Sequence, residues 1–258
     1  MQLYFQPKVR LDTGALDGAE ALLRWNDPEH GWICPAKLIA VAEDHGMMGA
    51  LGKWVLQEAA RQMSVWQKSE LYFPGRLAIN LCARQLEERD IAYKFERIVR
   101  EVGLTPACFE LELTESAPMR NVDEAIETIF LMKKAGFSVA IDDFGTGYSS
   151  LTYLKRLPAD TLKIDIAFVR DMLKNRGDFY IVTAIIGMAR HFGLKCVAEG
   201  VEEPAQAAAL LELGCDEAQG YYFGRPEPAH VFAQKWLQTI RPSTTVGGRA
   251  SQLGPGSD

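Results

Sequence analysis

Two adjacent carboxylates at the end of an apolar run are the residues of this chain best suited to chemistry. Asp142 and Asp143 follow the run SVAI and precede a glycine-rich stretch, residues 145–150. Successive strand side chains point to opposite faces, so both acids can face one cluster only where the strand ends and the backbone bends. The pattern predicts acids presented at a strand end, and an aspartate-rich surface turn is the alternative.

Other apolar runs also carry polar side chains at or just beyond their ends: Glu20, Asn80, Glu112, Lys163, Asp165, Glu199 and Gln219. Several carboxylates brought together raise one another's pKa unless cations neutralise them. Oxygen donors without His or Cys favour Mg²⁺ or Mn²⁺ over zinc or copper. Two such ions about 3.5–4 Å apart would clamp a phosphodiester and activate a water for in-line attack. Lys163 could orient that water or pair with a neighbouring acid.

The elements that must position these side chains follow from the hydrophobic period. Residues 3–24 read as an antiparallel hairpin that turns at 12–14. Six apolar strands follow, at 77–81, 109–114, 138–142, 161–165, 195–198 and 217–221. Helical patterns separate them, at 85–102, 122–135, 179–192, 204–213 and 228–237. Eight strands with right-handed crossovers predict an α/β fold, a TIM-like (β/α)8 barrel with an antiparallel first strand. An open doubly wound sheet is the alternative.

Length and composition favour one domain over residues 1–241. The 258 residues, of which 48% are hydrophobic, are close to the roughly 250 typical of one such barrel. Two helical patterns between residues 26 and 66 predict a small lobe on the barrel rim. Residues 242–258 have few apolar side chains and predict a disordered tail. Because the chain begins at a strand, we expect an upstream sensor or regulatory domain in a longer protein.

Charge and cysteine usage exclude several classes of protein. The net charge of −6 argues against a protein that binds duplex nucleic acid. The longest apolar run, residues 181–189, is about half of the ~20 residues that span a bilayer, so we expect no membrane contact. Five cysteines without a C-x-x-C pair predict reduced thiols and a cytoplasmic location.

Seven motifs in fixed order resemble the EAL-domain cyclic di-GMP phosphodiesterases. They are YFQP at 4–7, EALLRW at 20–25, ELTES at 112–116, DDFGTGYSSL at 142–151, LKRLPADTLKID at 154–165, VAEGVE at 197–202 and QGYYFGRP at 219–226. The resemblance runs from about Leu3 to Leu237. It implies a TIM-like barrel with an antiparallel first strand, in agreement with the periodicity. It also implies hydrolysis of cyclic di-GMP to linear pGpG.

The resemblance further implies a role for each matching residue. Two Mg²⁺ or Mn²⁺ ions would be held by Glu20, Asn80, Glu112, Asp142, Asp143 and Glu199. Glu20, Lys163 and Glu199 would be catalytic, with Glu199 acting as the base or only as a ligand. Contacts to the dinucleotide would come from Gln6, Leu23, Arg24, Asp165, Gln219, Arg225 and Pro226. Glu115 and Glu202 would brace the loop 144–150, which the family links to metal binding and to a homodimer.

The departures from the family pattern are few. Cys82 stands where serine is common, Gly224 replaces a frequent serine, and Ile166 with Ala167 replaces a basic residue and a serine. None removes a metal ligand. Ca²⁺ should inhibit, because a larger ion with looser geometry would misplace the nucleophile.

Three rival functions remain for comparison. A catalytically inactive EAL domain would act as a cyclic di-GMP receptor, and such members typically lose metal ligands or the loop. A protein kinase would share Asp143-Phe144-Gly145, but the H-R-D loop and the V-A-I-K lysine are missing. A barrel metalloenzyme for an ordinary metabolite would leave the motifs unexplained.

Overall fold

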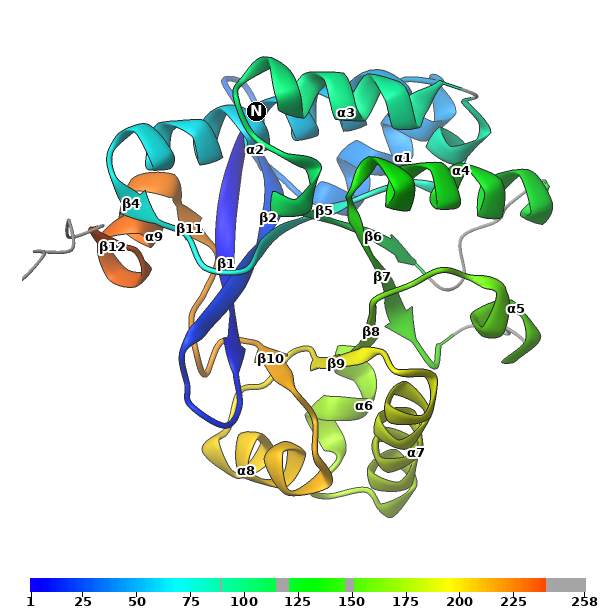
Figure 1. Ribbon diagram of the computed structural model, residues 1–258. Coiled ribbons are helices and arrows are strands. Elements are labelled where there is room, and N and C mark those ends of the chain that lie inside the picture. Colours follow the sequence, from blue (N-terminus) through cyan, green and yellow to red (C-terminus); the bar gives the residue numbers. More distant parts are fainter. Residues whose placement is uncertain (89, 115–120, 147–150, 240–258) are drawn as a thin grey trace, which may run out of the picture.

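Eight strands form a closed ring in the computed structural model, which describes residues 1–88, 90–114, 121–146 and 151–239. Around the ring they are β1 (Gln2–Arg10), β10 (Glu217–Gln219), β9 (Lys195–Ala198), β8 (Thr161–Ile164), β7 (Ser138–Phe144), β6 (Phe109–Thr114), β5 (Arg76–Asn80) and β2 (Leu16–Asp27). β1 runs antiparallel to both of its neighbours, β2 and β10, whereas the other neighbouring pairs are parallel. The predicted barrel with an antiparallel first strand is confirmed (Figure 1).

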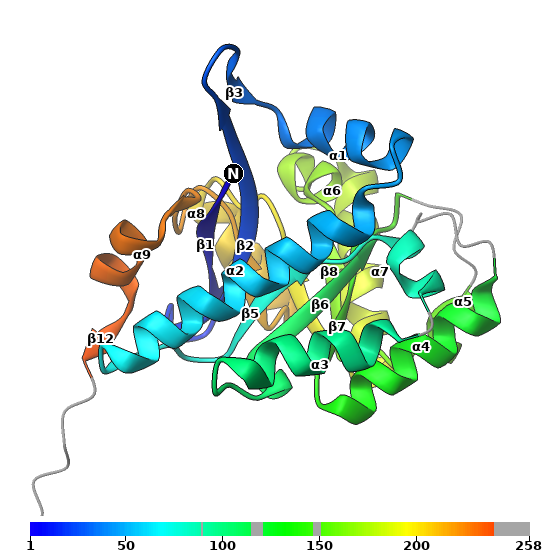
Figure 2. The same cartoon turned by 90° about the horizontal axis from the view of Figure 1, so that it is seen from above.

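Helices surround this ring on its outer side (Figures 1 and 2). The longer ones are α2 (Met48–Lys68), α3 (Ile91–Glu101), α4 (Val122–Ala135), α7 (Arg176–Phe192) and α8 (Pro204–Leu213). α4 shows why they begin and end where they do. The Asn121 side chain accepts a bond from the Glu124 backbone N–H, and Gly136 ends the helix in the left-handed conformation, with φ of 110°.

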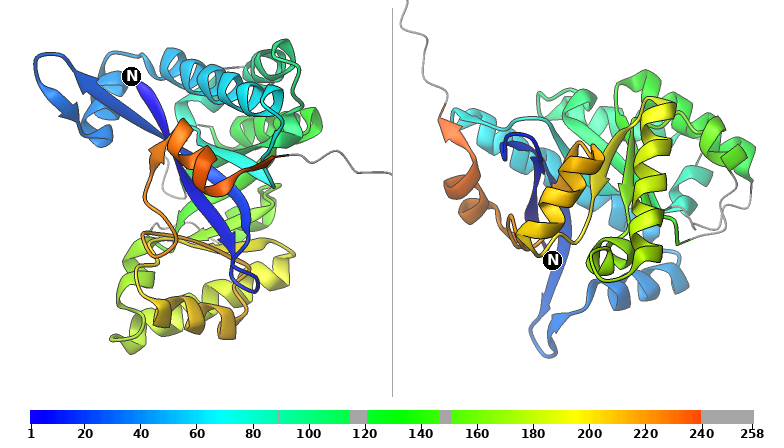
Figure 3. Two further views of the ribbon diagram at one scale, coloured as in Figure 1. Left: turned by 90° about the vertical axis from the view of Figure 1, so that its left-hand side faces the viewer. Right: turned by 90° about the horizontal axis from the view of Figure 1, so that it is seen from below.

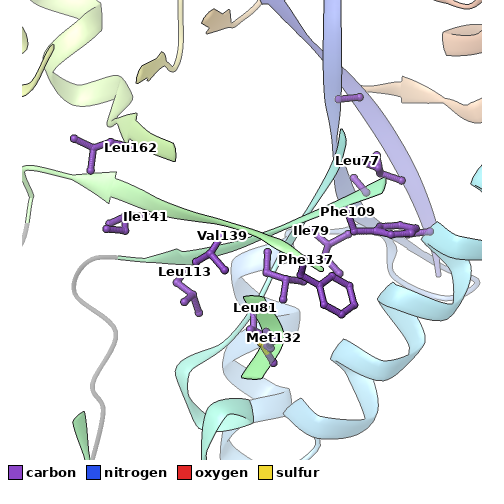
Figure 4. Close-up of a cluster of buried hydrophobic side chains, with 14 of the residues drawn as sticks. Leu77, Ile79, Leu81, Phe109, Leu113, Met132, Phe137, Val139, Ile141 and Leu162 are labelled. Atoms are coloured by element: carbon purple, nitrogen blue, oxygen red, sulfur yellow. The ribbon is translucent and has the colours of Figure 1, made fainter. Parts of the chain in front are cut away.

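The apolar core lies between the ring and the helices because strand side chains alternate. In β6, Phe109, Leu111 and Leu113 are buried among other apolar side chains, while Glu110 and Glu112 alternate with them and point into the ring. Figure 4 shows apolar residues of β5, β6 and β7 gathered near Met132 of α4. Each such side chain contributes about 1.5–3 kcal/mol by its burial. The inside of the ring is thereby left for polar groups.

The expected helix over residues 85–102 is divided in the structure. A 3-10 helix, η1 (Ala83–Glu87), precedes α3, and Glu88 between them is extended. The Gln85 side chain accepts a bond from the Cys82 backbone N–H at 3.0 Å, which closes the short helix on itself. The prediction of one continuous helix was therefore wrong.

The rim lobe is smaller than expected. β3 (Gly31–Ile33) extends β2 as a hairpin that projects beyond the barrel, and α1 (Pro35–Asp44) follows it (Figure 2). α2 instead packs on the ring as the crossover from β2 to β5, through a buried stripe that includes Leu56, Ala59 and Met63. Only the first of the two helical patterns belongs to the lobe.

The C-terminal elements α9 (Ala229–Trp236) and β12 (Gln238–Thr239) lie on the outside of the barrel, and α9 packs on the β1–β2 hairpin. α9 lies against β1 (Figure 3), where Phe232 joins an aromatic cluster with Phe5 and Trp66. β12 pairs with β4 (Leu71–Tyr72).

The remaining short elements are η2 (Pro106–Cys108), α5 (Leu151–Arg156), α6 (Ile166–Asp171) and β11 (Glu227–Pro228). The expected tail lies outside the described residues. Among the helices that are described, none has the length and apolar character to cross a bilayer.

Two glycines with the same positive φ test how tightly the barrel base is packed. Gly14 and Gly75 both have φ of +67°, but a Cβ on Gly75 would lie 1.7 Å from the Asp17 carbonyl oxygen, whereas none of the described atoms lies within 4 Å at Gly14. We expect Gly14→Ala to lower the free energy of unfolding by about 1–2 kcal/mol through backbone strain. Gly75→Ala should lower it by about 3 kcal/mol or more. Urea unfolding measures both, and equal losses would contradict the described packing.

Candidate active site

The structure brings the predicted strand-end residues to one end of the ring. Seven strands supply them: Glu20 from β2, Asn80 from β5, Glu112 from β6, Asp142 and Asp143 from β7, Lys163 from β8, Glu199 after β9 and Gln219 from β10. The strand register aligns them, since Asn80 pairs with Glu112 and Thr114 with Asp142. A backbone bond from Glu199 N to the Ile164 carbonyl, 3.1 Å long, holds Glu199 against β8.

One buried ammonium lies at the centre of the acids. Lys163 Nζ is 2.9 Å from Glu112 Oε2, 2.9 Å from Asp142 Oδ1 and 2.8 Å from Glu199 Oε1. The Lys163 side chain is 1% exposed. Burial alone would lower its pKa, but the surrounding carboxylates raise the pKa well above its ordinary value. Lys163 is therefore charged, and it partly neutralises acids from three other strands.

Glu20 has a different environment, made of amides. Asn80 Nδ2 donates to Glu20 Oε1 and Gln219 Nε2 donates to Glu20 Oε2, both at 2.7 Å. Gln219 Nε2 also donates to Gln6 Oε1 at 3.0 Å, and Gln6 Nε2 donates to the Gly224 carbonyl at 3.0 Å. Burial opposes ionisation, but Lys163 and the two amides hold the pKa of Glu20 below its usual value. These contacts favour the ionised form of Glu20.

A bend in β7 explains how two neighbouring aspartates reach one cluster. Asp143 has φ of +54°, which is uncommon for a residue other than glycine, and the register with β8 shifts between Ile141 and Phe144. The Asp143 backbone N–H donates to Asp142 Oδ1 at 3.0 Å. Asp142, Asp143 and Glu199 can each offer one oxygen within 4.8 Å of the others.

The remaining acids are not neutralised by Lys163 alone. Burial, and then the charges of Asp142 and Glu20, raise the pKa of Glu199 to about 8 despite Lys163. Burial together with Asp142 and Asp165 raises the pKa of Asp143 to about 6. The pKa of Glu112 is also raised well above its ordinary value, chiefly by burial. Further positive charge would favour the ionised forms.

The donor set of this cluster fits hard divalent cations. Among the described residues, no donor makes a hydrogen bond to either buried carboxylate oxygen of Glu112 or to Oε1 of Gln219. Buried acceptors are normally satisfied, so these oxygens are candidate ligand atoms. Carboxylate and amide oxygens without imidazole or thiolate are the ligands of Mg²⁺ and Mn²⁺. All four histidines of the chain are exposed.

A cleft beside the cluster contains two of the predicted substrate residues. A cavity of about 490 Å³ opens between the end of β2, α1 and α2, and its lining is mainly apolar and includes Leu23, Arg24 and Asn80. Arg24 donates to the Leu23 carbonyl at 2.8 Å, and its guanidinium lies over the Tyr4 ring at 5.7 Å. Arg225 is not in this cavity: it stacks on Tyr221 at 4.0 Å and lines a separate one of about 400 Å³.

The other predicted residues lie around the rim. Asp165 caps α6 by accepting a bond from the Ala167 backbone N–H at 2.7 Å, and Pro226 is half-buried before β11. Glu202 is exposed before α8, where its backbone N–H donates to Gln206 Oε1 at 2.8 Å. Glu115, which was expected to brace the loop 144–150, and residues 147–150 of that loop lie outside the described part of the chain.

Sequence reasoning missed a second ion pair inside the ring. Lys8 Nζ lies 2.6 Å from Glu110 Oε1 and 3.9 Å from Glu112 Oε1. A signal existed: Lys8 is two residues from Gln6, and Glu110 is two residues from Glu112, so each pair shares one strand face.

We expect Lys163→Met to destabilise the metal-free protein strongly. The substitution leaves three buried carboxylates without their cation, so the free energy of unfolding should fall by about 3–5 kcal/mol. Lys94→Met is the control, since Lys94 pairs with Glu88 and Asp90 at the surface and should contribute little. Urea unfolding in the presence of a chelator makes the comparison. Equal stabilities of the two variants would contradict the central role of Lys163.

Comparisons with known proteins show the family of this chain. The family described as EAL domain matches residues 1–226. Similar proteins of Pseudomonas aeruginosa include the bifunctional diguanylate cyclase/cyclic di-GMP phosphodiesterase MucR, which is 43% identical over 227 residues, 88% of this chain and 33% of MucR. The cyclic di-GMP phosphodiesterase NbdA is 41% identical over 245 residues, 93% of this chain and 30% of NbdA. The chain thus spans about a third of the length of these relatives.

Solved structures give the same result. The PaMucR phosphodiesterase in complex with c-di-GMP has a TM-score of 0.84 and 42% identity, over 89% of this chain and 93% of that one. The EAL domain of Mycobacterium smegmatis DcpA has a TM-score of 0.78 and 35% identity, over 92% and 95% of the two chains. A manganese/cy-diGMP complex of Klebsiella pneumoniae BlrP1 has a TM-score of 0.76 and 27% identity, over 88% and 56%. The chain therefore belongs to the EAL domain family.

Proposed function

We propose that this chain hydrolyses cyclic di-GMP to linear pGpG with the help of two divalent cations. The observation that supports this most directly is the set of oxygen donors from six strands beside Lys163, of which Glu112 and Gln219 have buried oxygens without hydrogen-bond donors. The phosphodiesterase names of MucR and NbdA, and the c-di-GMP in the PaMucR structure, support the choice of substrate.

The residues proposed to hold two Mg²⁺ or Mn²⁺ ions are Glu20, Asn80, Glu112, Asp142, Asp143 and Glu199. The manganese in the BlrP1 complex supports the choice of ion. When bound, such ions would activate a water and stabilise the entering and leaving oxygens of an in-line displacement. Asp143, at the bend of β7, is the acid that we assign to both ions.

Three side chains would then act on the reacting groups. Lys163 would offset the charge that develops on the phosphoryl oxygens, because its ammonium is fixed among the acids and excluded from solvent. Gln219 would position the water through Oε1, since its Nε2 is already bonded to Glu20. Glu199, whose carboxylate lies 2.8 Å from Lys163 Nζ, would take a proton from the water or act only as a ligand.

The apolar cavity next to Asn80 is proposed to receive one half of the dinucleotide. Arg24 at its edge could contact a phosphate or a guanine. We assign the remaining substrate contacts to Gln6, Leu23, Asp165, Arg225 and Pro226. Arg225 would have to leave its stacked position on Tyr221 or meet the ligand from that side.

The assembly around the domain is also a proposal. Relatives about three times as long as this chain support an upstream regulatory domain in the whole protein. We further propose a homodimer and a cytoplasmic location. A receptor that binds cyclic di-GMP without turnover is the second candidate function, because one cluster can hold a ligand whether or not it is cleaved.

The decisive assay is incubation with cyclic di-GMP and Mg²⁺ or Mn²⁺, followed by chromatography of the product. We expect pGpG from the unmodified chain, and loss of at least about 100-fold in kcat for Glu20→Ala and for Glu199→Ala, because each removes a proposed ligand. Excess Ca²⁺ should inhibit turnover. Glu87→Ala, at the end of η1, is a control that should leave kcat unchanged.

Tight binding of cyclic di-GMP without any pGpG would overturn the enzyme proposal and favour the receptor. Undiminished turnover in excess Ca²⁺ would contradict the role proposed for the two Mg²⁺ or Mn²⁺ ions, which are smaller than Ca²⁺.

A further inference from the structure

We propose that Lys8, held by Glu110, is a positioning residue that fixes the orientation of Glu112 from inside the barrel. The inference rests on the proposed function in that it takes Glu112 as a metal ligand. Lys8 and Glu110 lie one layer below the strand-end acids, and neither is among the residues that the proposed function uses.

The two oxygens of Glu112 face two different ammonium groups. Lys163 Nζ is 2.9 Å from Oε2, and Lys8 Nζ is 3.9 Å from Oε1. Neither lysine makes a well-aligned hydrogen bond to Glu112. The carboxylate is therefore oriented by charge from two sides, while its lone pairs are not taken by donors within the described structure. Outer-shell groups that orient a ligating carboxylate tune its affinity for the metal.

Lys8 is fixed in place by its own partners. Its Nζ is 2.6 Å from Glu110 Oε1, and Lys8 is 3% exposed. Glu110 in turn accepts hydrogen bonds at Oε2 from Thr161 Oγ1, at 2.8 Å, and from Ser138 Oγ, at 3.3 Å. The short contact with Lys8 and the hydroxyl bond from Thr161 favour an ionic pair. Strands β1, β6, β7 and β8 thus hold one rigid unit.

The backbone of β2 leaves room for this lysine. Gly18 lies opposite Lys8 in the β1–β2 register. A Cβ at Gly18 would lie 3.4 Å from Lys8 Cε and 2.5 Å from the Arg76 carbonyl oxygen. A side chain there would clash with the backbone of β5, and already its Cβ would be in van der Waals contact with the stem of Lys8. The lysine can therefore cross the ring toward Glu110 and Glu112.

Stability alone does not explain a charged pair at this position. Barrel interiors are usually filled by layers of branched apolar residues, and replacing a buried ion pair by neutral residues of similar volume is often neutral or stabilising. The pair does, however, present its positive end to Glu112. The ammonium of Lys8 on the Oε1 side opposes the attraction of Lys163 for Oε2, and the two together would fix the rotation of the Glu112 carboxylate.

The test is the double variant Lys8→Met/Glu110→Gln, which removes both charges. The amide oxygen that replaces the Glu110 carboxylate can still accept hydrogen bonds from the Ser138 and Thr161 hydroxyls. We expect it to fold with an unchanged or higher midpoint of thermal unfolding in a chelator. The dissociation constant for Mn²⁺, measured by electron paramagnetic resonance without substrate, should rise about tenfold or more. With cyclic di-GMP, kcat should fall by a similar factor while KM changes little.

The matched control is Lys195→Met/Glu217→Gln. This pair has the same N–O distance, 2.6 Å, but lies at the other end of the ring, where Lys195 contacts Asp17 and not the strand-end acids. Its removal should leave Mn²⁺ affinity unchanged. If the double variant does not fold, the single variant Glu110→Gln replaces it. This variant removes the partner of Lys8 but keeps the charge of Lys8, and it should also weaken Mn²⁺ binding.

Unchanged or tighter Mn²⁺ binding in the Lys8 variant would overturn the inference, because the pair would then be a stability element or simply a repulsive charge. The binding measurement separates this outcome from failure of the proposed function. A chain that never cleaves cyclic di-GMP would overturn the function, while the difference in Mn²⁺ affinity would still decide the role of Lys8.

Discussion

A single buried ammonium surrounded by carboxylates is the interaction on which this structure depends. Lys163 contacts acids from β6, β7 and the end of β9 at 2.8–2.9 Å. Without it, the barrel mouth would hold mutually repelling charges in a region that excludes water. With it, the charge is only partly balanced, as the raised pKa values of Glu112, Asp143 and Glu199 indicate. Lys163 neutralises the acids enough for the barrel to fold, but the site as a whole still lacks positive charge.

The barrel architecture holds these incompletely neutralised acids in a defined geometry. Alternation along each strand sends apolar side chains outward to the helices and polar ones inward, so β6 supplies both Leu111 to the core and Glu112 to the site. The antiparallel β1 closes the ring and places Gln6 and Lys8 on the inside, next to β10 and β2. The left-handed conformation of Asp143 then adds a second aspartate where regular alternation would have turned it away.

The sequence predicted the fold and the identity of the clustered residues because both follow from the spacing of apolar residues, which marks the strands and their ends. Phe109–Thr114 and Lys195–Ala198 were predicted to the residue, since the first alternates apolar and polar residues and the second is a short apolar run that ends at Glu199 and Gly200. The division of residues 85–102 into η1 and α3 was not predictable, because it depends on a side-chain bond from Gln85. Lys8 and Glu110 were missed for a related reason: only tertiary structure brings together residues 102 positions apart.

The central claim, that the acids around Lys163 form a two-cation site, is tested most directly by anomalous diffraction from crystals of this chain grown with Mn²⁺. We expect two neighbouring peaks at the carboxyl ends of the strands, one on each side of Asp143, with oxygens of Glu20, Glu112 and Glu199 among their ligands. Absence of any peak there, or Mn²⁺ bound only to acids on the outer surface, would contradict it.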